Sequence, residues 1–150
     1  MNKLLTTLVL VGFAGGVYAQ QAMKPEEMIK VRKAGYTFMA WNMGKIKANL
    51  DGDFNRAQVL AAARLVSATA NSGMGALFGP GSDKDVGGQK TRVKAEFFAQ
   101  PDKVKEMALN FISESNELAK VAESGDVAAI KAQFGKTGGT CKACHDRFRE

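Results

Sequence analysis

The C-terminal end of this 150-residue chain carries the feature that most constrains its fold, the pentapeptide Cys141-Lys142-Ala143-Cys144-His145. On a helix, Cys141, Cys144 and His145 stand at i, i+3 and i+4, so they project from one face. This spacing is typical of covalent haem attachment, in which two thiols add to the haem vinyl groups and the neighbouring imidazole reaches the iron. The motif uses both cysteines and the single histidine of the chain. We therefore expect a C-terminal helix that presents these three groups to a macrocycle.

Three other uses of the cysteines remain open. A thioredoxin-type redox pair sits near a strand–helix–strand unit, and the chain has no strand-rich pattern. A structural zinc site needs four ligands, whereas Cys141, Cys144 and His145 supply three, so a donor from outside the chain would be required. A disulfide between the two cysteines would leave His145 unexplained. Covalent haem is the interpretation that uses all three residues.

The first 19 residues have the pattern of a cleavable signal peptide. Lys3 gives a positive start, residues 4–17 are mostly apolar, and Ala19 ends a small-residue cleavage site. The apolar run is too short for a comfortable membrane span. We expect cleavage after Ala19 or one residue later, export to the periplasm, and a soluble mature domain over residues 20–150. Periplasmic export agrees with haem attachment, because bacterial c-type haem is fitted after transport.

The charge pattern gives no sign of a nucleic-acid partner. Removing Lys3, the only charged side chain in residues 1–19, lowers the formal net charge from +6 to +5. The lysines are scattered and do not alternate with aromatic residues, as they would on a nucleic-acid-binding face. We interpret them as a solvated surface and expect no nucleic-acid binding.

Apolar periodicity predicts an all-α fold, an antiparallel four-helix bundle with haem c attached near one end. Asp53 and Asp126 are the expected N-caps of the second and fourth helices. Phe78 is the expected apolar anchor of a long irregular stretch over residues 73–92. The predicted helices cover residues 24–49, 54–72, 101–123 and 127 to near the end, with a short helical turn at 93–99.

The first helix provides candidates for the side of the haem opposite His145. Its inward face carries Met28, Arg32, Gly35, Tyr36, Met39 and Met43. No second histidine exists, so a protein ligand at the sixth position of the iron would be one of Met23, Met28, Met39, Met43, Met74 and Met107. Tyr36 on this face would cover the iron without binding it at neutral pH, because a phenol keeps its proton there. The pattern predicts a five-coordinate, high-spin iron open to small neutral gases.

The sequence resembles the cytochromes c′, the four-helix-bundle (class II) c-type cytochromes that bind gases. The resemblance covers essentially the whole mature chain and depends on four segments. These are Cys141–Asp146 with Phe148 and Arg149, Lys24–Glu27, Arg32–Met39 and Phe78–Gly81.

The resemblance implies a role for each site residue. Cys141 and Cys144 match the thioether positions, His145 the axial ligand, and Arg149 a basic residue near the proximal haem face. Arg32 matches a position that contacts the haem propionates, and Tyr36 matches the distal position. The remaining candidate pocket residues are Lys33, Met39 and Phe78. Arg149 also stands four residues after His145, so we expect it on the same helical face.

Two departures from the family pattern stand near this pocket. Lys33 replaces a polar uncharged residue of several relatives, and Gly75 replaces a bulky aromatic of others. The resemblance also implies one covalent haem c per chain and a homodimer through the first two helices. The small residues of the second helix and exposed apolar positions of the first are compatible with such a dimer.

Three functions follow as hypotheses. The first is NO binding, with weaker CO binding, for NO buffering or carriage and with electron transfer to an unidentified redox partner. The second is a low-spin electron carrier in which a methionine of the first helix is the sixth ligand. The third, an enzyme, lacks a second histidine or an evident distal acid–base pair, so we expect none.

Overall fold

The structure, a computed structural model, describes residues 23–150, and the signal peptide expected at 1–19 lies outside them. Over this range the chain is helical, with two isolated bridges and no strand. The elements are α1 (Pro25–Asp51), α2 (Arg56–Ala70), η1 (Met74–Leu77), α3 (Ala95–Ala99), α4 (Pro101–Ala122) and α5 (Val127–Phe148). The predicted all-α class is confirmed.

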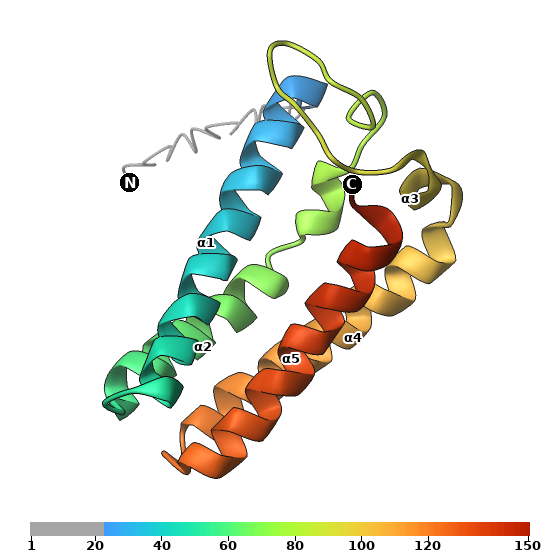
Figure 1. Ribbon diagram of the computed structural model, residues 1–150. Helices are drawn as coiled ribbons and strands as arrows, with labels where there is room; N and C mark the ends of the chain where they lie inside the picture. Colours follow the sequence, from blue (N-terminus) through green and yellow to red (C-terminus); the bar gives the residue numbers. More distant parts are fainter. Residues whose placement is uncertain (1–22) are drawn as a thin grey trace, which may run out of the picture.

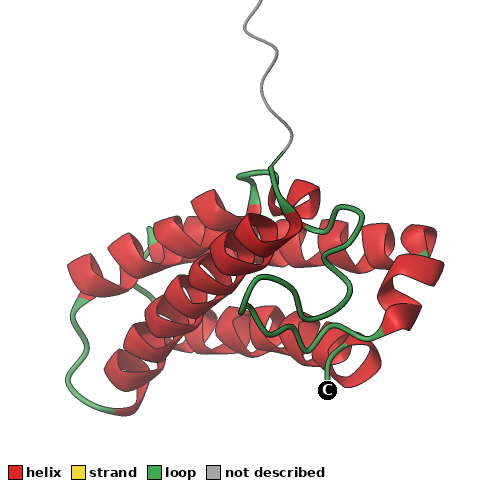
Figure 2. Cartoon of the chain, turned by 90° about the horizontal axis from the view of Figure 1, so that it is seen from above, coloured by secondary structure: helices red, strands yellow, loops and turns green. Residues whose placement is uncertain are grey.

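Helices α1, α2, α4 and α5 form an antiparallel bundle built from two hairpins (Figure 1). Helix α1 pairs with α2, α4 with α5, and α2 packs against α4, whereas α1 and α5 meet over few residues. The connection from α2 to α4 crosses the end of the bundle at which α1 begins and α5 ends (Figure 1). Seen from above, this connection lies across the helices as an extended loop (Figure 2).

The hydrophobic core lies toward the opposite end, where the two hairpins turn. Its fully buried cluster draws on the end of α1, the start of α2, the end of α4 and the start of α5. The cluster consists of Ile46, Val59, Ala62, Ala63, Leu118, Ala122 and Ile130. Ala62 and Ala63 of α2 therefore let the helices of one chain pack closely. The other end of the bundle, which the α2–α4 connection crosses, lies outside this core and can accommodate a binding site.

The predicted helix limits are close to the observed ones, with one wrong cap. Helix α2 starts at Arg56, and its N-cap is Asn55, whose Oδ1 accepts a hydrogen bond from the Gln58 N–H at 3.0 Å. The prediction of Asp53 as the cap was wrong. Asn49 Oδ1 accepts a hydrogen bond from the Asn55 N–H, so the turn closes at Asn55, two residues after Asp53. Asp126 is confirmed as the cap of α5, since its carboxylate accepts from Ala128 and Ala129.

The long connection is irregular, as expected, apart from η1 and the short helix α3 near the predicted turn at 93–99. At its far end, Val93 pairs with Arg149 in an isolated antiparallel bridge. Lys94 N–H donates to Phe148 O, and Glu150 N–H donates to Arg92 O, each at 2.9 Å. The C-terminal residues are therefore fixed to the connection.

No helix in the described part of the chain is long and apolar enough to cross a membrane.

Candidate haem site

The attachment motif occupies the last two turns of α5. The helix runs without interruption from Asp126, its cap, to Phe148, through three glycines at positions 135, 138 and 139. At each of these glycines, no heavy atom of another segment lies within 4 Å of the place that a Cβ would occupy, so close packing against another helix does not explain them. Cys141 and Cys144 are free and half-buried, and His145 is exposed.

The environment of the thiols differs from that of a redox-active pair. Burial raises the pKa of both Cys141 and Cys144, although a hydrogen bond with Thr140 opposes the rise at Cys141. A thioredoxin-type cysteine has a lowered pKa, because it acts as a thiolate. Among residues 23–150, no group of three or more His, Cys, Asp or Glu side chains is placed to hold a metal ion. The geometry therefore favours the haem interpretation of the motif.

Tyr36 of α1 stands across from the two thiols. Burial raises the pKa of the Tyr36 phenol to about 12, the charges of the Cys144 and Cys141 thiolates add to the rise, and Arg32 opposes it. The influence of both cysteines places the phenol near the motif, although the two belong to the first and last helices. The side chain of Tyr36 is still 43% exposed, so it lines an open face.

An aromatic cluster joins Tyr36 to the end of α5. Phe78, expected as an anchor, stacks on Phe97 with ring centroids 4.5 Å apart and meets the Tyr36 ring edge-on at 6.4 Å. Phe97 in turn meets Phe148, which is 2% exposed, at 5.6 Å. Four aromatic rings from α1, the connection, α3 and α5 thus form one continuous apolar wall.

Arg32 lies at the edge of this wall, where its side chain is buried and hydrogen-bonded. Its guanidinium stands 4.7 Å from the centroid of the Phe78 ring and donates four hydrogen bonds to residues of the connection. Lys33, the next residue, is exposed, and Met39 is only 5% exposed within α1. The propionate contacts implied for Arg32 and Lys33 stay predictions, and the structure gives Arg32 a different set of partners.

The expectation that Arg149 shares the helical face of His145 stays a prediction, because Arg149 stands just beyond the last residue of the helix. Helix α5 ends at Phe148, and Arg149 is its extended C-cap, with φ −125° and ψ 136°. Its N–H donates to His145 O at 3.0 Å, and its backbone pairs with Val93. The helix therefore ends at Phe148, whose carbonyl accepts a hydrogen bond from Lys94 of the connection instead of from a further helical turn.

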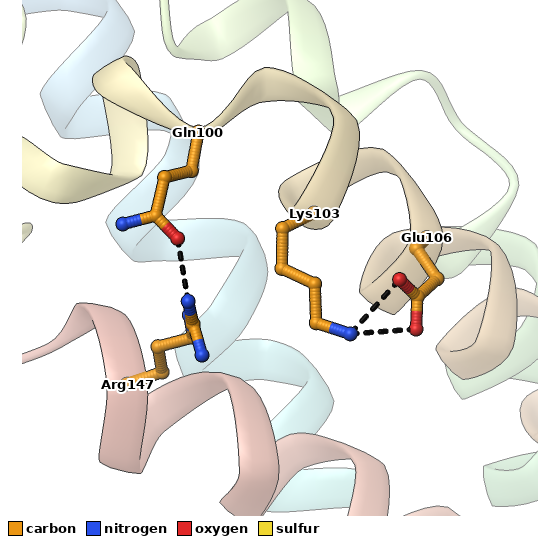
Figure 3. Close-up of polar contacts among 4 residues, drawn as sticks. All are labelled: Gln100, Lys103, Glu106 and Arg147. Atoms are coloured by element: carbon orange, nitrogen blue, oxygen red, sulfur yellow. Dashed lines mark hydrogen bonds and ion pairs between the residues drawn. The ribbon is translucent and has the colours of Figure 1, made fainter.

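Arg147, which no sequence pattern singled out, ties the last turn of α5 to the α3–α4 junction. Its Nη2 donates to Gln100 Oε1 at 2.6 Å (Figure 3). Beside it, the Lys103 ammonium pairs with both oxygens of Glu106, at 2.7 and 2.9 Å, and so stays within α4 (Figure 3). The motif is therefore held by side-chain as well as backbone contacts.

Most of the candidate methionines have other packing partners. A Cβ at Gly79 would lie 2.9 Å from Met28 Sδ, and one at Gly35 would lie 2.8 Å from Met74 Cε, so both thioethers pack against glycines. Met43 packs against the core cluster. Of the first-helix methionines, Met39 is the one buried a single turn from Tyr36.

The structure contains a cavity suited to an apolar group. A cavity of about 420 Å³ lies between η1, α3 and α4, lined mainly by Gly75, Phe78, Phe97, Phe98, Val104 and Ala108. Gly75 has nothing within 4 Å of a Cβ, so this position leaves the cavity open. Cys141, Cys144 and His145 do not line this cavity, which shares only Phe78 and Phe97 with the aromatic wall. Half-buried thiols, an aromatic wall and loosely packed α1 and α5 fit a flat hydrophobic macrocycle with covalent anchors.

Sequence reasoning missed the residues that connect these parts. Ser82 and Thr91, the hydroxyl partners of Arg32, lie in a stretch without periodicity. Phe97 fell within the short helical turn predicted at 93–99, but no pattern marked it as a site residue. The single usable signal was the pair Phe97-Phe98, which stands shortly before Pro101 and indicates an apolar turn ahead of a helix start.

Comparison with known proteins agrees with this geometry. Residues 27–149 match the family model described as cytochrome C′. The chain is 53% identical over 142 residues to a cytochrome c′ of Allochromatium vinosum, a match that covers 95% of this chain and 92% of that protein.

Two solved structures are informative. A cytochrome c′ described as showing an unusual ligand-controlled dimer dissociation has 56% identity and a TM-score of 0.84, covering 85% of this chain and 97% of that one. A carbon monoxide-bound variant of cytochrome c′ from Alcaligenes xylosoxidans has 28% identity and a TM-score of 0.74, with the same coverage. The chain belongs to the cytochrome c′ family, whose members bind haem c covalently.

Proposed function

We propose that this protein is a periplasmic haem protein that binds NO and, more weakly, CO at a five-coordinate, high-spin iron. Residues 1–19 serve as the signal peptide, and residues 20–150 form the exported domain. Cys141 and Cys144 hold haem c through thioether bonds, and His145 is the axial ligand. The carbon monoxide-bound relative supports the gas ligand.

The observation that carries this proposal is the aromatic wall that joins Tyr36 of α1, through Phe78 and Phe97, to the end of α5 beside the attachment motif. The haem, when bound, supplies the iron that takes up a diatomic gas. Tyr36 covers the pocket from α1, and its pKa of about 12 keeps the phenol protonated at neutral pH. A protonated phenol restricts the space for a ligand, and its hydroxyl is a hydrogen-bond donor. Selectivity between gases then depends on whether the strength of each gas's bond to the iron offsets the steric cost of fitting beside Tyr36.

The other side chains hold the pocket together. Phe78 and Phe97 exclude water from one side. The chain has a single histidine, so no second imidazole is available for acid–base chemistry, and we infer that the protein is not an enzyme. NO buffering or carriage, with electron transfer to a redox partner, is the role that these features support.

A second function, low-spin electron carriage, has one observation in its favour. Met39 is a buried thioether on the same helix as Tyr36, one turn away. A rearranged α1 that brought this sulfur to the iron would give a six-coordinate centre, and an axial methionine raises the reduction potential. Met28 and Met74 are less suited, because each packs on a glycine of another segment.

We further infer a homodimer that uses the exposed apolar side of α1. Val31, Phe38 and Trp41 are 46%, 43% and 58% exposed, and Leu65 of α2 is 39% exposed. The first three recur at helical spacing, so they share a side of α1. Dimer dissociation in a relative supports this assembly. Sedimentation of wild type and Trp41→Ala tests it, since the variant should dissociate at lower dilution, and a monomeric wild type would reject it.

The test of function is the optical spectrum of the holoprotein, purified from the periplasm and reduced, with and without CO and NO. A broad high-spin Soret band that shifts with each gas supports the proposal. A sharp low-spin spectrum that CO leaves unchanged would reject it in favour of Met39, and Met39→Leu should then restore gas binding. Tyr36→Phe keeps the ring and isolates the effect of the hydroxyl, with Thr37→Val as a surface control on the same helix.

A further inference from the structure

Arg32 is a buried cation whose hydrogen bonds all go to one segment. The residue is 3% exposed. Its Nη1 donates to Leu77 O at 3.1 Å and to Ser82 Oγ at 2.8 Å. Its Nη2 donates to Ser82 O and to Thr91 Oγ1, each at 2.7 Å. One side chain of α1 therefore holds the connection at three points separated by up to fourteen residues of sequence.

These bonds occupy the guanidinium almost completely. Two nitrogens with two N–H groups each make four bonds, which leaves only the Nε–H as a free donor. The acceptors are two carbonyls and two hydroxyls, and none of the ion pairs among residues 23–150 includes Arg32. A carboxylate could take at most the remaining Nε–H without displacing one of these partners, so the main contacts of Arg32 fix the backbone.

The hydrogen bonds continue from Thr91 toward the proposed axial ligand. Thr91 Oγ1 accepts a second hydrogen bond, from the Val93 N–H at 3.2 Å. Val93 pairs with Arg149, and the Arg149 N–H donates to His145 O at 3.0 Å. A short series of contacts thus joins α1, beside Tyr36, to the backbone of His145 in α5.

The C-terminal residues have few other attachments to the connection. They are Phe148, which the Phe97 ring contacts, the two backbone bonds of Lys94 and Glu150, and the bond from Arg147 to Gln100. All but the last depend on residues 92–97 lying at one position along α5. Thr91 is the last residue before that stretch whose side chain is fixed to α1.

We propose that Arg32 and Thr91 are positioning residues, which hold residues 91–94 against the C-terminus and thereby set the backbone of His145. The inference rests on the proposed role of His145 as axial ligand. A shift of the connection would move the Arg149 N–H relative to His145 O, and with it the imidazole. Arg32 thus acts on the far side of the pocket although it belongs to the helix of Tyr36.

The first test is amide hydrogen exchange on the holoprotein with Thr91→Val, which removes only the hydroxyl and keeps the branched shape. Exchange at Lys94, Arg149 and Glu150 should become about tenfold faster or more, because a bond to a charged donor is lost. Amides in the core-facing turns of α2 and α4 should keep their rates. Thr37→Val, an exposed threonine of α1, is the matched control.

Arg32→Lys extends the test, with Arg64→Lys at an exposed arginine as its control. Lysine keeps the charge but cannot reach all four acceptors, so this variant should affect the same three amides at least as strongly. Unchanged exchange in Thr91→Val, or an equal acceleration throughout the bundle, would overturn the proposal.

A spectroscopic measurement addresses His145 itself. The iron–histidine stretching band of the reduced holoprotein should shift in Thr91→Val and stay in place in Thr37→Val. Faster exchange at the three amides with an unshifted band would overturn the link to His145. Failure of the proposed axial role is recognised separately, because the band would then be missing from the wild type as well.

Discussion

Truncation of Phe148 tests whether the end of α5 is held by packing. The side chain is 2% exposed and meets the edge of Phe97 at 5.6 Å, with the Arg147 guanidinium 5.5 Å from its ring centroid. Loss of a buried phenylalanine costs about 3–5 kcal/mol. We expect the lower end, about 3 kcal/mol, because neighbours near a chain end can relax into the space. That is a large part of the roughly 5–15 kcal/mol of a typical domain.

The assay is urea and thermal unfolding of holo Phe148→Ala, followed by circular dichroism at a dilution that keeps the chain monomeric. The melting temperature should fall by about 10 °C. Phe38→Ala is the control, since Phe38 is 43% exposed and its loss should cost about 1 kcal/mol or less. The reasoning is refuted if both variants lose the same free energy of unfolding, because burial of Phe148 would then stabilise the protein no more than an exposed phenylalanine does.

Three further predictions concern other parts of the chain. Tyr36 is the only tyrosine of residues 20–150, so a tyrosine-specific titration of the mature protein should give one transition above pH 10, because burial raises the pKa of the phenol. The unfolded chain releases this proton near pH 10, so stability should fall as the pH rises above that value, by roughly 1 kcal/mol for a side chain this exposed, and Tyr36→Phe should lack the loss. Asn42→Leu should raise the free energy of unfolding by about 1 kcal/mol, because Asn42 Oδ1 is buried without a hydrogen-bond partner in the described chain, and a loss of stability in urea would contradict this. Gly125→Ala should cost about 1–2 kcal/mol by the same assay, since φ is +76° and the new Cβ would lie 2.9 Å from Arg56 Cδ, and an unchanged midpoint would show that the turn adapts.

The helices were predictable because their signals are local. Periodicity together with Pro25, Pro101, Gly125 and Asp126 set most limits within a few residues. The N-cap of α2 was not predictable, because it depends on a contact with the preceding helix. Asn49 Oδ1 accepts the N–H of Asn55, six residues later, and this hydrogen bond decides where the turn closes. Local rules rank Asp53 and Asn55 nearly equally as caps, and a contact from the previous helix made the choice.

The site was predictable only in part, for the same reason. The spacing of Cys141, Cys144 and His145 expresses a chemical requirement within one helix, so sequence reveals it directly. The partners of Arg32 lie in an irregular stretch, and nothing local marks Ser82 or Thr91 as their acceptors. The pairing of Arg149 likewise depends on Val93, more than fifty residues away in sequence.

The location of the core at the hairpin turns has a consequence for maturation. Ile130 is the only α5 residue in the fully buried cluster, so the last turns of that helix contribute little to it. A newly made chain can therefore keep the turn end assembled while the last turns of α5 fray. An enzyme that joins vinyl groups to thiols needs access to just such a loosened end, and closing of the C-terminal pairing afterwards would complete the protein.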